Sequence, residues 1–177
     1  GADYSIKRLI EELDSRIFSI TFVSLNESFL KKKFNKNVEF IRIKSRRTLF
    51  AINDLRKIVK NFIQLNKFKK IIVFSNQNFA NIISFFSLYK LRNVKKIFID
   101  RNHLDELKFY NTLIEKFKKK IIKILIKLTY KKANLVIGIS NKLSLDLGKF
   151  CKIRVKTIYS PGYDKSILKK ASSKISL

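Results

Sequence analysis

The chain has 177 residues, 46% of them hydrophobic, and a formal net charge of +27. This length and apolar content suit one domain with a sizeable core and exclude an intrinsically disordered chain. The single cysteine excludes an internal disulfide framework. Because the sequence has only one histidine and one cysteine, it also argues against a metal centre.

No targeting segment is evident in the sequence. It contains no stretch of about 18 uncharged apolar residues, and residues 1–20 lack the layout of a signal peptide. There is no methionine, even at position 1, so we expect a processed or excised piece of a longer chain. We expect that piece to be soluble or peripheral, in a reducing compartment such as the cytoplasm.

Helical spacing of apolar residues alternates with short apolar runs along the chain. In chain order, the pattern predicts a helix over 3–15, strands over 17–25 and 38–43 separated by a turn-like segment at 26–37, a helix over 48–66, a strand over 71–74, a helix over 79–91, a strand over 96–100, a long helix over 104–132, a strand over 134–139, a helix over 141–150 and a strand over 155–159.

Strands that alternate with helices, most of them fully apolar, are typical of a parallel sheet covered on both faces. We therefore expect an α/β fold, with a doubly wound, mostly parallel, Rossmann-like sheet of about six strands. No linker-like tract or internal repeat divides the chain. Residues 1–177 are expected to form a single domain, in which residues 165–177 begin a connection to another part of the protein.

Polar side chains follow three of the predicted strands. The carboxyl ends of parallel strands meet at one edge of a sheet, and ligands bind there in open α/β folds. The only histidine lies among these residues, and imidazole can donate or transfer a proton near neutral pH. The sequence therefore predicts a candidate site made of Ser75, Asn76, Arg101, Asn102, His103, Ser140 and Asn141.

These residues also have structural interpretations. Ser140 and Asn141 stand at the start of a predicted helix, where such residues commonly cap the backbone. His103 equally suits a surface or capping position, and Asp100 a structural cap. At the other end of the chain, Gly1 and Ala2 head a helix whose free N–H groups favour a phosphate.

The predicted helix 104–132 has a basic face. Six lysines fall within about one third of its circumference, and apolar residues fill most of the remainder. Such a face attracts anionic lipid at about 1 kcal/mol per lysine, whereas the alternative is a helix that covers the sheet and leaves its lysines in solvent. The candidate membrane-surface residues are Lys116, Lys119, Lys120, Lys123, Lys127 and Lys131.

The high charge would also attract nucleic acid. However, most of the basic residues are lysines, which lack the bidentate fork that arginine uses to bind bases and phosphates. We find no zinc-ligand pattern, helix-turn-helix spacing or RNA-binding aromatic motif. A basic nucleic-acid-binding domain, or a non-catalytic interaction module, is the alternative to an enzyme.

Several segments resemble one known family. Residues 133–141 (ANLVIGISN) and 155–164 (VKTIYSPGYD) resemble the segments that close the N-terminal domain of family 4 retaining glycosyltransferases. Residues 1–3 (GAD) and the helix after them are similar to the glycine-rich turn and first helix of those enzymes. Residues 98–103 (FIDRNH) resemble the strand ending in a histidine that faces their interdomain cleft. Ser160 replaces the usual asparagine, and Asn134 the usual aspartate.

The resemblance implies the acceptor-binding half of a two-domain GT-B enzyme, which transfers a sugar with retention from a nucleotide-diphosphate donor in polysaccharide or glycolipid synthesis. It implies His103 as a catalytic residue, Gly1 and Ala2 as donor-phosphate ligands, and acceptor binding by Arg101, Asn102, Ser140, Asn141, Ser75 and Asn76. No metal or other cofactor is implied.

The resemblance also predicts what surrounds this piece. In the family a first strand precedes the glycine turn, and a C-terminal domain holds the donor. We expect this chain to lack both and to be inactive alone. The partners it implies are that second domain, a saccharide or lipid-linked acceptor and an anionic membrane, with the enzyme peripheral on the cytoplasmic face of the inner membrane.

Overall fold

The computed structural model describes residues 2–25, 38–44, 50–65, 70–91 and 93–160. Within these ranges the chain is an α/β structure in which every pair of neighbouring strands is parallel, as the sequence predicted. The predicted turn at 26–37, the predicted connection at 165–177 and Gly1 lie outside the described residues.

The strands form two parallel sheets in the described part of the chain, not the single sheet of about six strands that we expected. The smaller sheet pairs Thr21–Ser24 (β1) with Glu39–Arg42 (β2). The larger sheet runs in sequence order through Ile71–Asn76 (β3), Val94–Asp100 (β4), Leu135–Gly138 (β5) and Lys156–Thr157 (β6).

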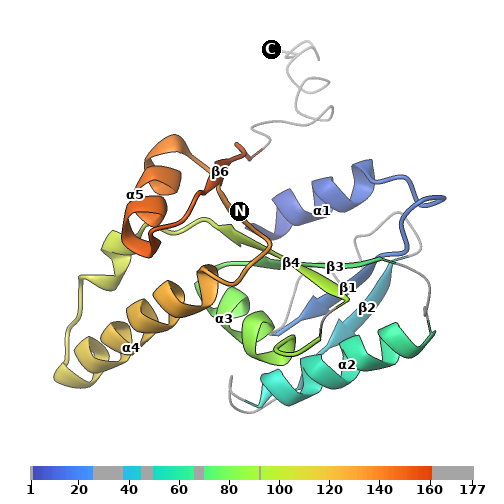
Figure 1. Cartoon of the computed structure of the whole chain (residues 1–177), viewed down its shortest axis with the longest axis horizontal. Helices are drawn as coiled ribbons and strands as arrows, with labels where there is room; N and C mark the ends of the chain where they lie inside the picture. The colour runs from blue at the N-terminus through green and yellow to red at the C-terminus, as the bar shows by residue number, and fades with distance from the viewer. Residues whose placement is uncertain (1, 26–37, 45–49, 66–69, 92, 161–177) are drawn as a thin grey trace, which may run out of the picture.

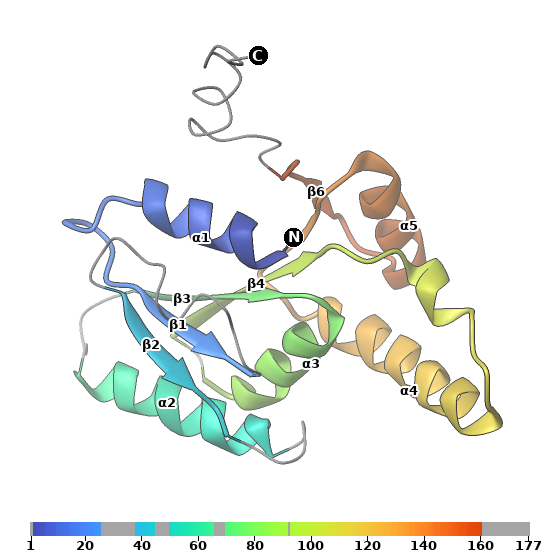
Figure 2. The ribbon, with the colours of Figure 1, turned by 180° about the vertical axis from the view of Figure 1, so that it is seen from behind.

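Helices cover both faces, which makes the architecture doubly wound (Figure 1). Helix α1 lies on one side of the strands, and α2 and α3 lie on the other, in both Figure 1 and Figure 2. The helices are Ala2–Glu12 (α1), Ala51–Leu65 (α2), Asn78–Ser87 (α3), the short 3-10 helix Leu104–Leu107 (η2), Leu113–Tyr130 (α4) and Asn141–Cys151 (α5).

Two apolar clusters form the core. The first joins α3, α4 and α5 to β4 and β5, with Phe98 and Tyr130 as its largest fully buried side chains. The second lies under α2 and α3, and Val23 of β1 and Val73 of β3 both pack against it. The second cluster therefore connects the two sheets through side chains.

The first strand begins later than the sequence predicted. Asp14 starts a turn, in which its carbonyl accepts hydrogen bonds from the backbone N–H groups of Ile17 and Phe18. The Arg16 guanidinium binds the Asp14 carboxylate through both Nε and Nη2 and holds this turn. Ile17 and Phe18 are exposed, so β1 starts only at Thr21, where side chains reach the core.

The predicted long helix over 104–132 is interrupted. Helix η2 ends at Leu107, and α4 begins at Leu113. Two hydrogen bonds fix that start: the N-cap Thr112 hydroxyl accepts from the Glu115 N–H at 3.2 Å, and the Glu115 carboxylate accepts from the N–H of Asn111, the residue before the N-cap, at 2.9 Å. The T-x-x-E spacing was visible in the sequence, but the apolar periodicity obscured it.

Gly138 allows α5 to pack closely on the end of β5. A Cβ atom at this position would lie 2.5 Å from the Ser144 hydroxyl and 3.1 Å from the Ser144 backbone nitrogen. The backbone contact cannot be relieved by rotating a side chain. Only a glycine therefore fits between β5 and the first turns of α5.

We expect Gly138→Ala to lower the free energy of unfolding by about 2 kcal/mol, because α5 must move off the strand. Gly148→Ala is the comparison variant: a Cβ there has one tight contact, with the Ile153 carbonyl oxygen at 3.2 Å, and none as close as 2.5 Å, so we expect a smaller loss. Urea denaturation of both variants measures the difference. Equal effects of the two substitutions would contradict this account of Gly138.

Candidate functional site

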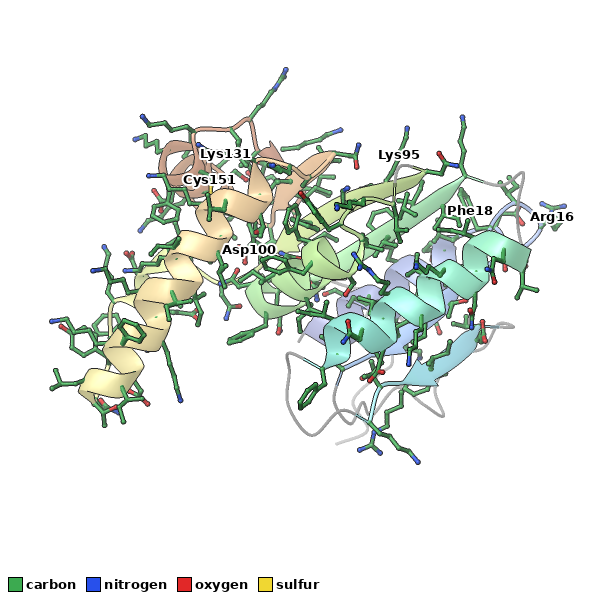
Figure 3. The ribbon with its side chains drawn as sticks, turned by 60° about the horizontal axis from the view of Figure 1, so that its bottom comes forward. Arg16, Phe18, Lys95, Asp100, Lys131 and Cys151 are labelled. Carbon is green, nitrogen blue, oxygen red and sulfur yellow. The ribbon has the colours of Figure 1, made fainter. Side chains whose placement is uncertain are left out.

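A buried polar cluster lies beneath the carboxyl edge of the larger sheet. Asp100, the last residue of β4, is fully buried and lies between α3 and α4 (Figure 3). The Tyr130 hydroxyl donates to its carboxylate at 3.0 Å, and Asn81 donates to the Tyr130 oxygen at 2.9 Å. The Ser75 hydroxyl completes this series of hydrogen bonds by donating to the side-chain oxygen (Oδ1) of Asn81 at 2.6 Å.

The Asp100 carboxylate also organises the backbone after β4. It accepts hydrogen bonds from the backbone N–H groups of Arg101 at 2.9 Å and Asn102 at 3.4 Å. Asn78, with its amide nitrogen oriented toward Asp100, donates to both carboxylate oxygens at 2.7 and 2.6 Å. Asp100 therefore fixes the loop that carries the predicted site residues.

Burial sets the protonation of this carboxyl group. Desolvation raises the pKa of Asp100 to about 6, and the hydrogen bonds from Tyr130 and the two backbone N–H groups only partly oppose it. Burial also raises the pKa of Tyr130 far above its ordinary range. Tyr130 therefore stays protonated and remains a donor to Asp100.

Arg101 spans the carboxyl edge of the sheet. Its Nε donates to the side-chain oxygen (Oδ1) of Asn76 at 2.8 Å, and its Nη1 donates to the Ser160 hydroxyl at 3.0 Å. Asn76 ends β3 and Ser160 follows β6, so one side chain links the two outer strands of this sheet. The two hydrogen bonds also hold the guanidinium in one orientation.

Both hydrogen-bond partners of the Arg101 guanidinium, Asn76 and Ser160, are neutral. No carboxylate forms an ion pair with its guanidinium in the described part of the chain. Partial burial lowers the pKa of Arg101, but a guanidinium stays protonated in proteins. Its remaining N–H groups can bind an anion or the oxygen atoms of a polar ligand.

His103 lies on the same loop, with its ring toward α5. Its Nδ1 is 3.9 Å from the Asp146 carboxylate, and both side chains are about half exposed. The Asp146 carboxylate faces the Nδ1 side of the imidazole, and the exposed part of the ring can contact a ligand. The pair therefore has the composition of an acid–base or hydrogen-bonding centre.

The other predicted site residues have mixed placements. The Ser140 hydroxyl caps α5 by accepting from the Leu143 N–H at 3.3 Å, and Asn141 is the exposed first residue of that helix. The Asn102 amide donates to the Glu106 carboxylate at 2.8 Å. Ser75 belongs to the buried cluster, where its hydroxyl is already engaged.

The proposed phosphate site at the N-terminus is only partly described. Ala2 is the first residue of α1, whereas Gly1 lies outside the described residues. Free N–H groups in the first turn of α1 are compatible with anion binding.

The six predicted membrane-surface lysines have different environments. Lys119 donates to the backbone carbonyls of Glu106 and Phe109 and so anchors the segment before α4. The Lys116 ammonium lies 5.3 Å from the centroid of the Tyr110 ring. Lys120, Lys123 and Lys127 also lie on α4, and Lys131 is its C-cap residue.

No group of three or more histidine, cysteine, aspartate or glutamate side chains with a metal-binding arrangement occurs in the described ranges. Among the helices of these ranges, none has the length and apolarity that a membrane span requires.

Sequence reasoning missed two residues of this edge. Ser160 holds the Arg101 side chain, and Asp146 faces His103. Ser160 follows the last strand, so the rule that identified the other edge residues would also have selected it. Asp146 lies in the second turn of α5, and no sequence signal links it to His103.

No known family model matches the sequence, and no curated protein shows significant similarity to it.

We predict a pH dependence of stability from Asp100. Its pKa in the folded state, about 6, lies above the ordinary 3.8, so folding favours the protonated form. This contribution to stability is complete below pH 4 and is lost as the pH rises to about 6, a change of about 3 kcal/mol. Asp100→Asn, which does not titrate, removes this loss.

The measurement is urea denaturation of the parent and the Asp100→Asn variant between pH 4 and pH 7. We expect the stability difference between the two proteins to shift toward the variant as the pH rises. A difference that is constant across this range would contradict the raised pKa of Asp100.

Proposed function

We propose that this chain is the acceptor-binding domain of a nucleotide-sugar-dependent glycosyltransferase that retains anomeric configuration. The parallel α/β fold supports this proposal, because open sheets of this kind bind ligands at their carboxyl edge. The sequence resemblance in residues 98–103, 133–141 and 155–164 supplies the choice of reaction.

The observation that carries the proposal is Arg101 held across the carboxyl edge by Asn76 and Ser160. A guanidinium fixed in this way donates to two oxygen atoms at once. Adjacent sugar hydroxyls and the oxygens of a phosphate both present such pairs. An acceptor that carries a sugar, or a phosphate-linked sugar, therefore suits this group.

His103 supplies the second contact in this proposal. The Asp146 carboxylate lies near its Nδ1 and leaves Nε2 free to donate to a sugar hydroxyl. In the transfer step, the acceptor hydroxyl oxygen bonds to the sugar C1 on the face from which the diphosphate leaves, which retains the configuration. The bond from C1 to the diphosphate oxygen breaks, and the hydroxyl proton passes to the departing diphosphate. The Nε2–H of His103 near that centre would donate a hydrogen bond to the departing oxygen.

The donor belongs mainly to a second domain in this proposal. The N-terminus of α1, at Gly1 and Ala2, would contact the donor diphosphate, and the C-terminal domain of the same enzyme would hold the nucleotide. In this proposal residues 1–177 supply acceptor binding, and sugar transfer also requires the donor-binding domain. Its location is the cytoplasm, at the inner face of the membrane, where an acceptor linked to lipid is extended.

The prediction is that the chain binds a defined set of saccharides on a glycan array and in saturation-transfer NMR. Arg101→Ala and His103→Ala should each weaken that binding at least tenfold, because the first removes a charge-assisted hydrogen bond and the second removes a ring N–H donor. Asp146→Asn should weaken it less, because it affects only the orientation of the His103 ring.

The matched control is Lys95→Ala, which removes one positive charge near the opposite end of β4 (Figure 3). Saccharide binding should be unchanged in this variant. If Lys95→Ala and Arg101→Ala weakened binding equally, the carboxyl edge would not be the site. Tight, sequence-selective DNA binding at physiological salt, without saccharide binding, would favour a nucleic-acid-binding domain instead.

A further inference from the structure

Helix α4 carries an apolar stripe on its outer surface. At 100° per residue, six large apolar side chains of this helix fall within about 100° of arc, mostly at spacings of three and four residues. Each is between 41% and 81% exposed. The members of the outer stripe are Leu113, Ile114, Phe117, Ile121, Ile124 and Leu128.

A different face of α4 packs on the protein core. Ile126 is fully buried, and Ile122 and Leu125 pack against the same cluster. Ile122 and Ile126 lie on the side of the helix away from the middle of the outer stripe, and Leu125 lies between the two faces. Helix α4 thus has two apolar faces, and covering the sheet accounts for only one of them.

The outer stripe is prominent because α4 projects from the body of the protein. No residue of α4 before Ile126 is buried. Figures 1 and 2 show the start of the helix as the point furthest from the sheet. Phe109 and Tyr110, just before the helix, are also exposed and extend the apolar surface at this end.

A row of lysines borders the outer stripe. Lys116, Lys120, Lys123 and Lys127 fall within about 60° of arc on one flank of it. Of the predicted lysine face, Lys119 is the member that binds backbone carbonyls. The row therefore places positive charge beside exposed apolar side chains along the length of the helix.

We propose that this face of α4 inserts into an anionic lipid bilayer, with the outer stripe among the acyl chains and the lysine row at the lipid phosphates. An amphipathic helix that lies in the membrane interface has this combination of faces. A nucleic acid would engage the lysines but offers no apolar phase for the outer stripe.

The inference rests on the membrane location proposed above but not on sugar transfer, so vesicle binding and saccharide binding can fail separately. It exceeds the earlier expectation of a lysine face, because it assigns insertion to apolar residues rather than surface attraction to lysines alone.

The test uses a tryptophan probe, because the chain contains no tryptophan. In Phe117→Trp the indole replaces an exposed ring of the outer stripe. The vesicles contain phosphatidylcholine with about 30% of the anionic lipid phosphatidylglycerol. We expect a blue-shifted tryptophan emission and quenching by brominated acyl chains. Phe18→Trp is the control, since Phe18 lies at the opposite end of the molecule from α4 (Figure 3).

Two further variants separate insertion from charge. Phe117→Ser combined with Ile121→Ser should lower the vesicle partition coefficient at least tenfold. Lys120→Gln combined with Lys123→Gln should lower it about 25-fold, or about fivefold for each lysine. Both pairs change exposed or half-exposed side chains of α4, and circular dichroism verifies that the variants fold.

Four outcomes would overturn the proposal. The first is an unshifted, unquenched Phe117→Trp spectrum in anionic vesicles, and the second is equal quenching of Phe18→Trp. The third is vesicle binding by the serine variant that equals that of the parent, because the lysines alone would then hold the protein at the surface. The fourth is binding of the parent to a DNA duplex but not to vesicles, which would identify the alternative polyanion.

Discussion

One buried carboxylate holds the carboxyl edge of the larger sheet together. Asp100 has no contact with solvent, yet donors from α3, α4 and the loop after β4 surround it. An ionisable group without such partners would be too costly to bury. The positions of both helices relative to β4 therefore depend on satisfying this group, and Tyr130 must stay a donor for the arrangement to persist.

The buried cluster fixes the positions of residues at the carboxyl edge above it. The backbone N–H groups of Arg101 and Asn102 are fixed by Asp100, so the Arg101 side chain starts from a defined point and reaches Ser160. Arg101, which a ligand could reach, is thus positioned by Asp100, which is buried beneath it. This division between a rigid buried layer and an accessible outer layer is common in sites that bind polar ligands.

The fold class was predictable because apolar runs and helical spacing alternate clearly, and most of the strands read as continuous apolar segments. Apolar periodicity gave the wrong element boundaries where a polar contact sets the backbone conformation, as at the Asp14 turn and the Thr112 N-cap. The position of Arg101 at the edge followed from topology. Its partner Ser160 and the pairing of His103 with Asp146 depend on side-chain packing between distant segments, which a sequence pattern does not encode.

The separation of the strands into two sheets has a consequence for local stability. Within the described residues no ladder joins β1–β2 to β3–β6, and the second apolar cluster connects the two sheets through side chains. A two-stranded sheet has little stability of its own. We therefore expect its amide protons to exchange with solvent through openings that leave the four-stranded sheet intact, so that the two sheets differ in protection.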